Sequence, residues 1–326
     1  MAVQSLISEL NLMEKLASAH RWMPLESGDI VDIVAPGSAC TPSELKGAVQ
    51  FLKSWGLVPR YPAKLFGRDV FCSNTDEKRF QFLKQALYAR DSKAVWCLRG
   101  GYGAIRLLPQ LEKLKKPKAS KLFIGYSDVT TLHHFLNQKW HWSTIHGPLL
   151  ARMGAPDLPI KERRELQSLL FGQSPEITFS GLRPLNALAR KSRLISSTVV
   201  GGNLVVAQSL MGTPWQAKTA GGILFFEEVS ERGYRIDRML EHLKQSGHFD
   251  RIKAVVFGDI VGGKEPNGRS LTNKAVERFA SSVKFPVLRG VKAGHGAVQR
   301  PVPFLTPACL TLGAKPKLVV ASGALA

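Results

Sequence analysis

Short apolar runs alternate with helical patterns along the first half of the chain. Apolar residues dominate positions 30–35, 94–98 and 121–125, and each run closes at a turn that contains glycine. Residues 43–55, between the first two runs, have the spacing of an amphipathic helix. Strands that alternate with helices in this way predict βαβ units and a parallel sheet.

Three of these strand ends carry polar or glycine-rich loops, at residues 36–38, 99–103 and 125–128. In parallel sheets, ligands collect at the carboxyl ends of the strands. The pattern therefore predicts that the three loops meet at one site.

The alternation weakens beyond residue 151. A short charged helix is predicted over 160–170, and several glycines and prolines follow it. We therefore predict an N-terminal α/β domain over residues 1–170, a connection over 171–192 and a C-terminal domain over 193–326.

The C-terminal part is again predicted to mix strands and helices. Strand patterns occupy 197–203, 221–228 and 254–259. The clearest helix begins near Tyr234, with apolar residues at helical spacing, and ends at Gly247.

Size and composition narrow the class of protein. A length of 326 residues exceeds a typical single domain and favours two domains that share a cleft. No stretch approaches the roughly 20 apolar residues that span a bilayer, so we expect no membrane span. Residues 1–28 lack the pattern of a secretion signal, which predicts a cytoplasmic location.

The four cysteines, Cys40, Cys72, Cys97 and Cys309, are scattered without any paired spacing. This pattern predicts buried thiols in a reducing compartment, with neither a disulfide framework nor a zinc site. We expect no metal.

A net charge of +20 is the strongest anomaly of composition. It points to anionic partners, such as nucleic acid, acidic lipid or an anionic small substrate. The basic residues are dispersed, without zinc-finger spacing or an RNA-binding aromatic motif. The pattern disfavours specific nucleic-acid recognition and favours a solvated basic surface.

The glycine-rich loop at 99–103 is not a phosphate loop. It lacks the lysine and the serine or threonine of a P-loop, and its spacing misses the dinucleotide fingerprint. We therefore expect no nucleotide cofactor. Glycines after a strand do suit the exposure of backbone N–H groups to a substrate carbonyl.

Ser127 lies where an apolar run breaks at Gly125, just before a helical segment. A strand-to-helix turn of this kind can expose a nucleophilic serine. Local pattern alone also describes a plain turn in which Ser127 or Asp128 caps the helix, and it favours this alternative.

Several motifs, in this order, resemble the LD-carboxypeptidase family of serine peptidases, over about residues 28–310. They are RGGYGAIRLL (99–108), IGYSDVTTL (124–132), HGP (146–148), GGNL (201–204), MGTP (211–214), ILFFEE (223–228), YRIDRML (234–240) and GHG (294–296).

This resemblance implies an amidotransferase-like parallel-sheet N-domain and a smaller, swivelling β/β/α-like C-domain around one cleft. It implies a triad in which Ser127 is the nucleophile, His295 the general base and Glu227 the carboxylate that orients the imidazole. The chain order is unimportant, because triads are defined by geometry.

Other residues near these motifs have alternative interpretations. Glu227 and Glu228 would face opposite ways on a strand, so only one can address His295. The family pattern favours Glu227, because it directly follows the apolar run. His133 and His134 are expected to be structural, as is the Asp128 side chain.

Positions beside the nucleophile predict how the substrate is held. Backbone N–H groups of Gly101 and Asp128 are the candidates for an oxyanion hole, and Arg99 for clamping a terminal carboxylate. The family's usual substrate is a murein tetrapeptide that loses its terminal D-alanine during cell-wall recycling in the cytoplasm. Family members are often dimers, so a homodimer is expected.

Two other functions stay open from the sequence. One is a relative of the same fold that hydrolyses an aminoacyl-nucleotide antibiotic and confers self-immunity, with the same triad. The other is a basic anion-binding protein with an inactive hydrolase fold, which the presence of Ser127, Glu227 and His295 disfavours.

Overall fold

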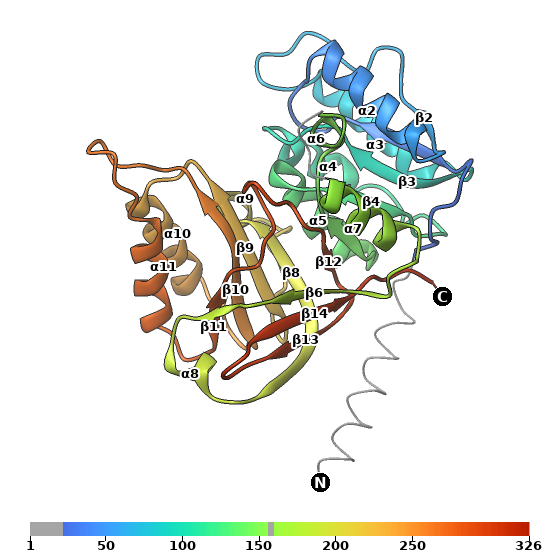
Figure 1. Ribbon diagram of the computed structural model, residues 1–326. Coiled ribbons are helices and arrows are strands. Elements are labelled where there is room, and N and C mark those ends of the chain that lie inside the picture. Colours follow the sequence, from blue (N-terminus) through green and yellow to red (C-terminus); the bar gives the residue numbers. More distant parts are fainter. Residues whose placement is uncertain (1–21, 156–159, 326) are drawn as a thin grey trace.

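The computed structural model describes residues 22–155 and 160–325, which form two α/β lobes, each on its own sheet (Figure 1). The first lobe holds a six-stranded sheet in the order β12-β5-β4-β3-β1-β2. Every pair in it is parallel except β12 with β5. The strands are β1 (Ile30–Val34), β2 (Val58–Arg60), β3 (Ser92–Cys97), β4 (Leu122–Gly125), β5 (Thr144–His146) and β12 (Val302–Phe304).

Helices cover both faces of this sheet. They are α2 (Pro42–Ser54), α3 (Asp76–Tyr88), α4 (Leu108–Leu111), α5 (Thr130–Phe135), α6 (Leu150–Met153) and α7 (Ile160–Leu170), with 3₁₀ turns η1 (Ala104–Leu107) and η2 (Ser127–Val129) and a π-helical turn η3 (Leu136–Trp140). The helix predicted over 43–55 is α2, and Thr41 and Glu44 form a capping box at its start.

The second lobe holds an eight-stranded sheet in the order β6-β14-β13-β8-β9-β10-β11-β7. Strands β8 to β11 are parallel, and the outer strands pair antiparallel. The strands are β6 (Glu176–Ser180), β7 (Arg183–Pro184), β8 (Leu194–Asn203), β9 (Ile223–Val229), β10 (Ala254–Val261), β11 (Val287–Arg289), β13 (Pro307–Thr311) and β14 (Lys317–Ala321).

Its helices are α8 (Ala187–Arg190), α9 (Leu204–Ser209), α10 (Gly233–Gln245) and α11 (Thr272–Ser281). The helix predicted near Tyr234 is α10, whose apolar stripe of Ile236, Leu240 and Leu243 is buried. Helices α10 and α11 lie side by side against one face of the sheet (Figure 1). Among the helices that the structure describes, none combines the length and apolar character needed to cross a bilayer.

The central parallel strands of both sheets are buried on both faces, which explains their near-continuous apolar runs, whereas the outer strands β6 and β14 alternate buried and less buried positions. On β9, Phe225 packs into one core cluster while Leu224 and Phe226 pack into the cluster on the opposite face. The predicted α/β fold class is confirmed, with a parallel-rich sheet in the first lobe and a mixed one in the second.

Two parts of the chain lie where the pattern alone did not place them. Strand β12 follows the strands β8 to β11 in the sequence, yet it pairs with β5 at the edge of the first sheet. The segment 171–192, predicted as a connection, supplies β6, β7 and α8, and its two strands form the edges of the second sheet.

Candidate active site

Ser127 stands on a sharp turn between β4 and the helical segment that follows it. Its φ angle is 66°, in the left-handed region that serine rarely adopts, at a cost of about 1–2 kcal/mol. Ser127 is half-buried, whereas every other residue from 121 to 130 is buried. The turn therefore presents one serine side chain out of an otherwise closed structure.

The glycine-rich loop after β3 packs against this turn. A Cβ atom on Gly100 would lie 2.8 Å from Cβ of Ser127, so only glycine fits there. Ser38 joins the same cluster, because its N–H donates to the carbonyl of Gly100 at 2.9 Å and its hydroxyl accepts from the N–H of Tyr102 at 3.2 Å. The three loops predicted to converge do meet.

The Asp128 side chain braces the glycine loop. Its carboxylate is buried and accepts a hydrogen bond of 2.8 Å from the N–H of Ala104. Burial raises the pKa of Asp128 to about 6, although the hydrogen bonds from Ala104 and Gly103 oppose the shift. The sequence predicted a cap or structural partner, and the structure places the side chain in a structural role.

Glu227 and His295 come from different parts of the second lobe and meet directly. Oε2 of Glu227 lies 2.6 Å from Nδ1 of His295 and also accepts from the His295 backbone N–H at 3.3 Å. A Cβ atom on Gly294 would lie 2.7 Å from Cβ of Glu227, so glycine permits this approach. Glu227 is fully buried.

The imidazole of His295 lies against the residue that precedes Ser127. Its ring centroid is 4.6 Å from that of Tyr126, at an angle of 61° between the rings. The histidine of the second lobe thus packs beside the serine-bearing turn of the first.

Glu228 faces the other side of β9. Its carboxylate accepts hydrogen bonds from the N–H of Val205 at 2.7 Å, from the N–H of Val229 at 2.8 Å and from the Asn203 amide at 3.1 Å. Burial raises the pKa of Glu228 to about 7. Of the two adjacent glutamates, only Glu227 touches His295.

Charge around His295 controls its protonation. Burial by itself lowers the pKa of His295, but the hydrogen bond to Glu227 and the charges of Glu227 and Glu228 outweigh it. The net result is a pKa above the ordinary value of 6.5. An imidazole of this kind accepts a proton readily, as a general base must.

Arg99 lies beside the glycine loop at a cavity of about 390 Å³, which Ser43, Leu149 and Arg152 also line. Its guanidinium is 3.5 Å from the carboxylate of Glu44, and its side chain is 47% exposed. The structure thus places a positive charge, paired with Glu44, at the edge of the loops around Ser127.

No local sequence pattern indicates the residues that connect the loop of His295 to the first lobe. Gln299 donates from Nε2 to the Tyr126 hydroxyl at 3.2 Å and from its N–H to Glu162 at 3.1 Å. Arg300 pairs with Glu165 of α7 at 2.6 Å and 2.7 Å. These contacts join segments more than 130 residues apart, so local pattern does not reveal them.

Two histidines that follow Ser127 in the sequence bind backbone carbonyls and are not part of the Ser127, Glu227 and His295 group. His133 bonds through Nε2 to the carbonyl of Gly125 at 2.8 Å, and His134 to that of Gly201 at 3.0 Å. Burial lowers the pKa of His133 to about 3 and that of His134 to about 4, so both are neutral. Within residues 22–155 and 160–325, no cluster of His, Cys, Asp and Glu is arranged to hold a metal ion.

Comparison with known proteins assigns the family. The model of the LD-carboxypeptidase N-terminal domain matches residues 31–147, and that of the LD-carboxypeptidase C-terminal domain matches residues 196–310. The chain belongs to the LD-carboxypeptidase family. The resemblance identified from the sequence motifs is therefore confirmed. The family and the names of its relatives support a carboxypeptidase.

The named relatives include both murein carboxypeptidases and a self-immunity protein. It is 28% identical to the murein tetrapeptide carboxypeptidase of Pseudomonas aeruginosa, over 88% of this chain and 94% of that one. The crystal structure of muramoyltetrapeptide carboxypeptidase from Oxalobacter formigenes is similar, with a TM-score of 0.78 and 30% identity, over 89% of this chain and 98% of that one. The Microcin C7 self-immunity protein MccF of Escherichia coli is 24% identical, over 83% of this chain and 87% of that one.

Proposed function

We propose that this protein is a serine-type LD-carboxypeptidase that releases the terminal D-alanine from murein tetrapeptides, in the cytoplasmic recycling of cell-wall peptides. The observation that carries the proposal is the 2.6 Å contact between Glu227 and His295, beside the turn that presents Ser127 at a φ of 66°. The names of the relatives with tetrapeptide activity support the choice of substrate.

The chemistry follows from which nitrogen of His295 is engaged. Nδ1 is held by Glu227, which leaves Nε2 to accept the proton from the Ser127 hydroxyl. The serine oxygen attacks the carbonyl carbon of the scissile amide, and His295 then gives the proton to the departing amine of D-alanine. Water, deprotonated by the same imidazole, hydrolyses the resulting acyl-enzyme.

The backbone donors proposed for the oxyanion are the N–H groups of Gly101 and Asp128. Gly101 belongs to the loop that packs on Ser127, and Asp128 directly follows the nucleophile. Removing one donor from such a site typically lowers the rate by about 10²–10³. Arg99 is proposed to bind a carboxylate of the substrate, which carries several.

The self-immunity alternative rests on the MccF relative, which shares the fold and covers most of the chain. We favour the carboxypeptidase because the segment 228–234, from the end of β9 through the link to the start of α10, is short and resembles that branch. The homodimer expected from the family is proposed as well.

Incubation with two substrates separates these functions. We expect mass spectrometry to show loss of one D-alanine from free murein tetrapeptide and no hydrolysis of an aminoacyl-sulfamoyl nucleoside. The reverse result would establish the self-immunity reaction instead. If neither substrate is hydrolysed and the protein binds DNA with a steep salt dependence, an inactive hydrolase fold is supported.

The pH dependence of kcat/KM tests the role of His295. Because the base must be neutral, we expect kcat/KM to fall as the pH drops through the pKa of His295, with a midpoint above 6.5. The Glu227→Gln variant removes the partner that raises this pKa, so its residual activity should have a midpoint at lower pH. A profile that stays flat between about pH 5 and 8 would contradict a histidine base.

A further inference from the structure

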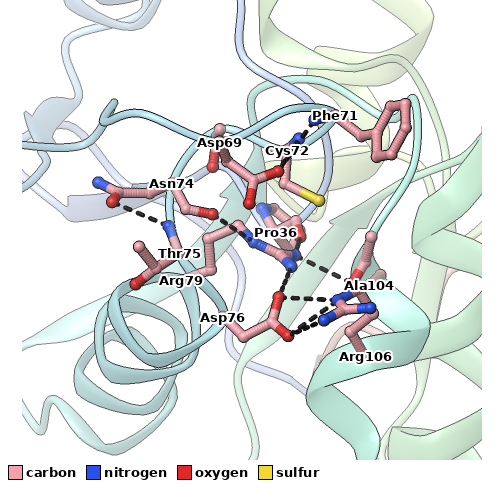
Figure 2. Close-up of polar contacts among 12 residues, drawn as sticks. Pro36, Asp69, Phe71, Cys72, Asn74, Thr75, Asp76, Arg79, Ala104 and Arg106 are labelled. Carbon is pink, nitrogen blue, oxygen red and sulfur yellow. Dashed lines mark hydrogen bonds and ion pairs between the residues drawn. The ribbon is translucent and has the colours of Figure 1, made fainter.

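Arg79 is a fully buried arginine beneath the loops around Ser127, on α3 of the first lobe. Its side chain has no exposed surface. Figure 2 shows the guanidinium surrounded by polar groups from separate segments of the chain. Nε donates to the carbonyl of Asn74 at 3.1 Å, and Nη2 donates to Asp76 at 2.5 Å.

The remaining contacts of Arg79 are to two of the loops of the candidate site. Nη1 donates to the carbonyl of Gly103 at 2.9 Å and, through a short contact, to the carbonyl of Pro36. One nitrogen thus joins the loop after β1 to the glycine loop after β3. A planar guanidinium is suited to this task, because its donors point in fixed directions.

The glycine loop is thereby held at two successive residues. Arg79 holds the carbonyl of Gly103, and the Asp128 carboxylate holds the N–H of Ala104. Gly101 lies two residues before Gly103, and the backbone N–H of Asp128 follows the nucleophile. The two contacts therefore tie the glycine loop, two residues after Gly101, to the turn that carries Asp128.

Stability alone is a poor reason for this arrangement. Burying a charged guanidinium is costly, and Asp76 is the one carboxylate among residues 22–155 and 160–325 that pairs with it directly. Asp76 itself is shared with Arg106, whose side chain is 53% exposed (Figure 2). Apolar packing would stabilise the same site at lower cost, whereas it would not hold two backbone carbonyls in register.

We infer that Arg79 is a positioning residue, which holds the loops 36–38 and 99–103 in the geometry that the oxyanion donors require. This inference rests on the proposed function for its kinetic consequence. Arg79 needs no contact with the reacting atoms for this role, because its effect passes through the backbone of Gly103.

Arg79→Lys tests the inference, because lysine keeps the charge but cannot reproduce the fork. We expect kcat for D-alanine release to fall about tenfold to a hundredfold, with KM changed less than about threefold, as displaced catalytic geometry predicts. Amide hydrogen exchange over residues 98–104 should become faster. Arg79→Gln provides a second variant. If neither Arg79 variant folds, the same two measurements are made on Asp76→Asn, which removes the ion pair but keeps the guanidinium.

Arg60→Lys is the matched control. Arg60 on β2 binds Asp32 of β1 at 2.6 Å and 3.0 Å and Asp91, just before β3, at 2.7 Å, without a hydrogen bond to these loops. The Arg60→Lys change should lower the melting temperature while leaving kcat and the amide exchange of residues 98–104 unchanged.

A folded Arg79 variant with kcat within twofold of wild type and unchanged amide exchange overturns the inference. An equal loss of kcat in Arg60→Lys overturns it as well. If wild type releases no D-alanine, the proposed function fails, and loop exchange still decides whether Arg79 holds the loop.

Discussion

Replacing Ser127 by alanine is expected to lower kcat for D-alanine release by about 10⁴ or more while the protein stays folded. The change removes the only atom that can form the acyl-enzyme, so whatever activity remains comes from binding and from the oxyanion donors. Alanine keeps the Cβ atom, and hence the backbone strain at φ 66° is the same in both proteins. We therefore expect little change in melting temperature.

Release of D-alanine from murein tetrapeptide, followed by mass spectrometry, measures this effect. Ser281→Ala is a suitable control, because Ser281 ends α11 on the surface and its hydroxyl donates to the Glu277 carbonyl of the same helix at 3.0 Å. Ser281→Ala should retain the wild-type rate. Substantial turnover by folded Ser127→Ala would rule out Ser127 as the nucleophile.

The second large effect is expected for Glu227→Gln, which should lower kcat by about 10⁴, as in other triads whose carboxylate becomes an amide. Glutamine can donate to Nδ1 of His295 and so favour the tautomer whose Nε2 carries a proton. That tautomer cannot accept the serine proton. The negative charge that stabilises the imidazolium is lost in the same change.

Glu228→Gln is the natural comparison, because the two residues are adjacent and equally buried. Glu228 contacts the backbone of Val205 and Val229 and has no contact with His295, so we expect a loss of less than about tenfold. Steady-state kinetics on both purified variants, with melting temperatures to verify folding, decides between them. Equal losses, or a larger one in Glu228→Gln, would reassign the orienting carboxylate.

Local pattern predicted the parts of the fold whose signals are short in sequence. The helix over 43–55, the helix after Tyr234 and the strands that end near the three loops were all visible as periodicity. Alternation along a strand also separated Glu227 from Glu228. Which of the two faces His295 depends on a loop more than sixty residues further along, and no local pattern contains that information.

Arg79 illustrates the same limit at a single residue. It stands in the run Asp76-Glu77-Lys78-Arg79, where every residue is charged and nothing distinguishes the buried member from the exposed ones. Its guanidinium is buried among acceptors that include the carbonyls of Pro36 and Gly103, which belong to other loops. The contacts of Gln299 with Tyr126 and Glu162 join residues still further apart in the sequence, by 173 and 137 positions.

Strand β12 has a consequence for how this chain can be divided. It begins seven residues after His295 and completes the edge of the first sheet by pairing with β5. A fragment that stops at residue 170 would leave the hydrogen-bonding groups of β5 open, which favours association between copies. Recombination of halves from different family members would break the same pairing, so the two lobes are expected to be inherited and exchanged together.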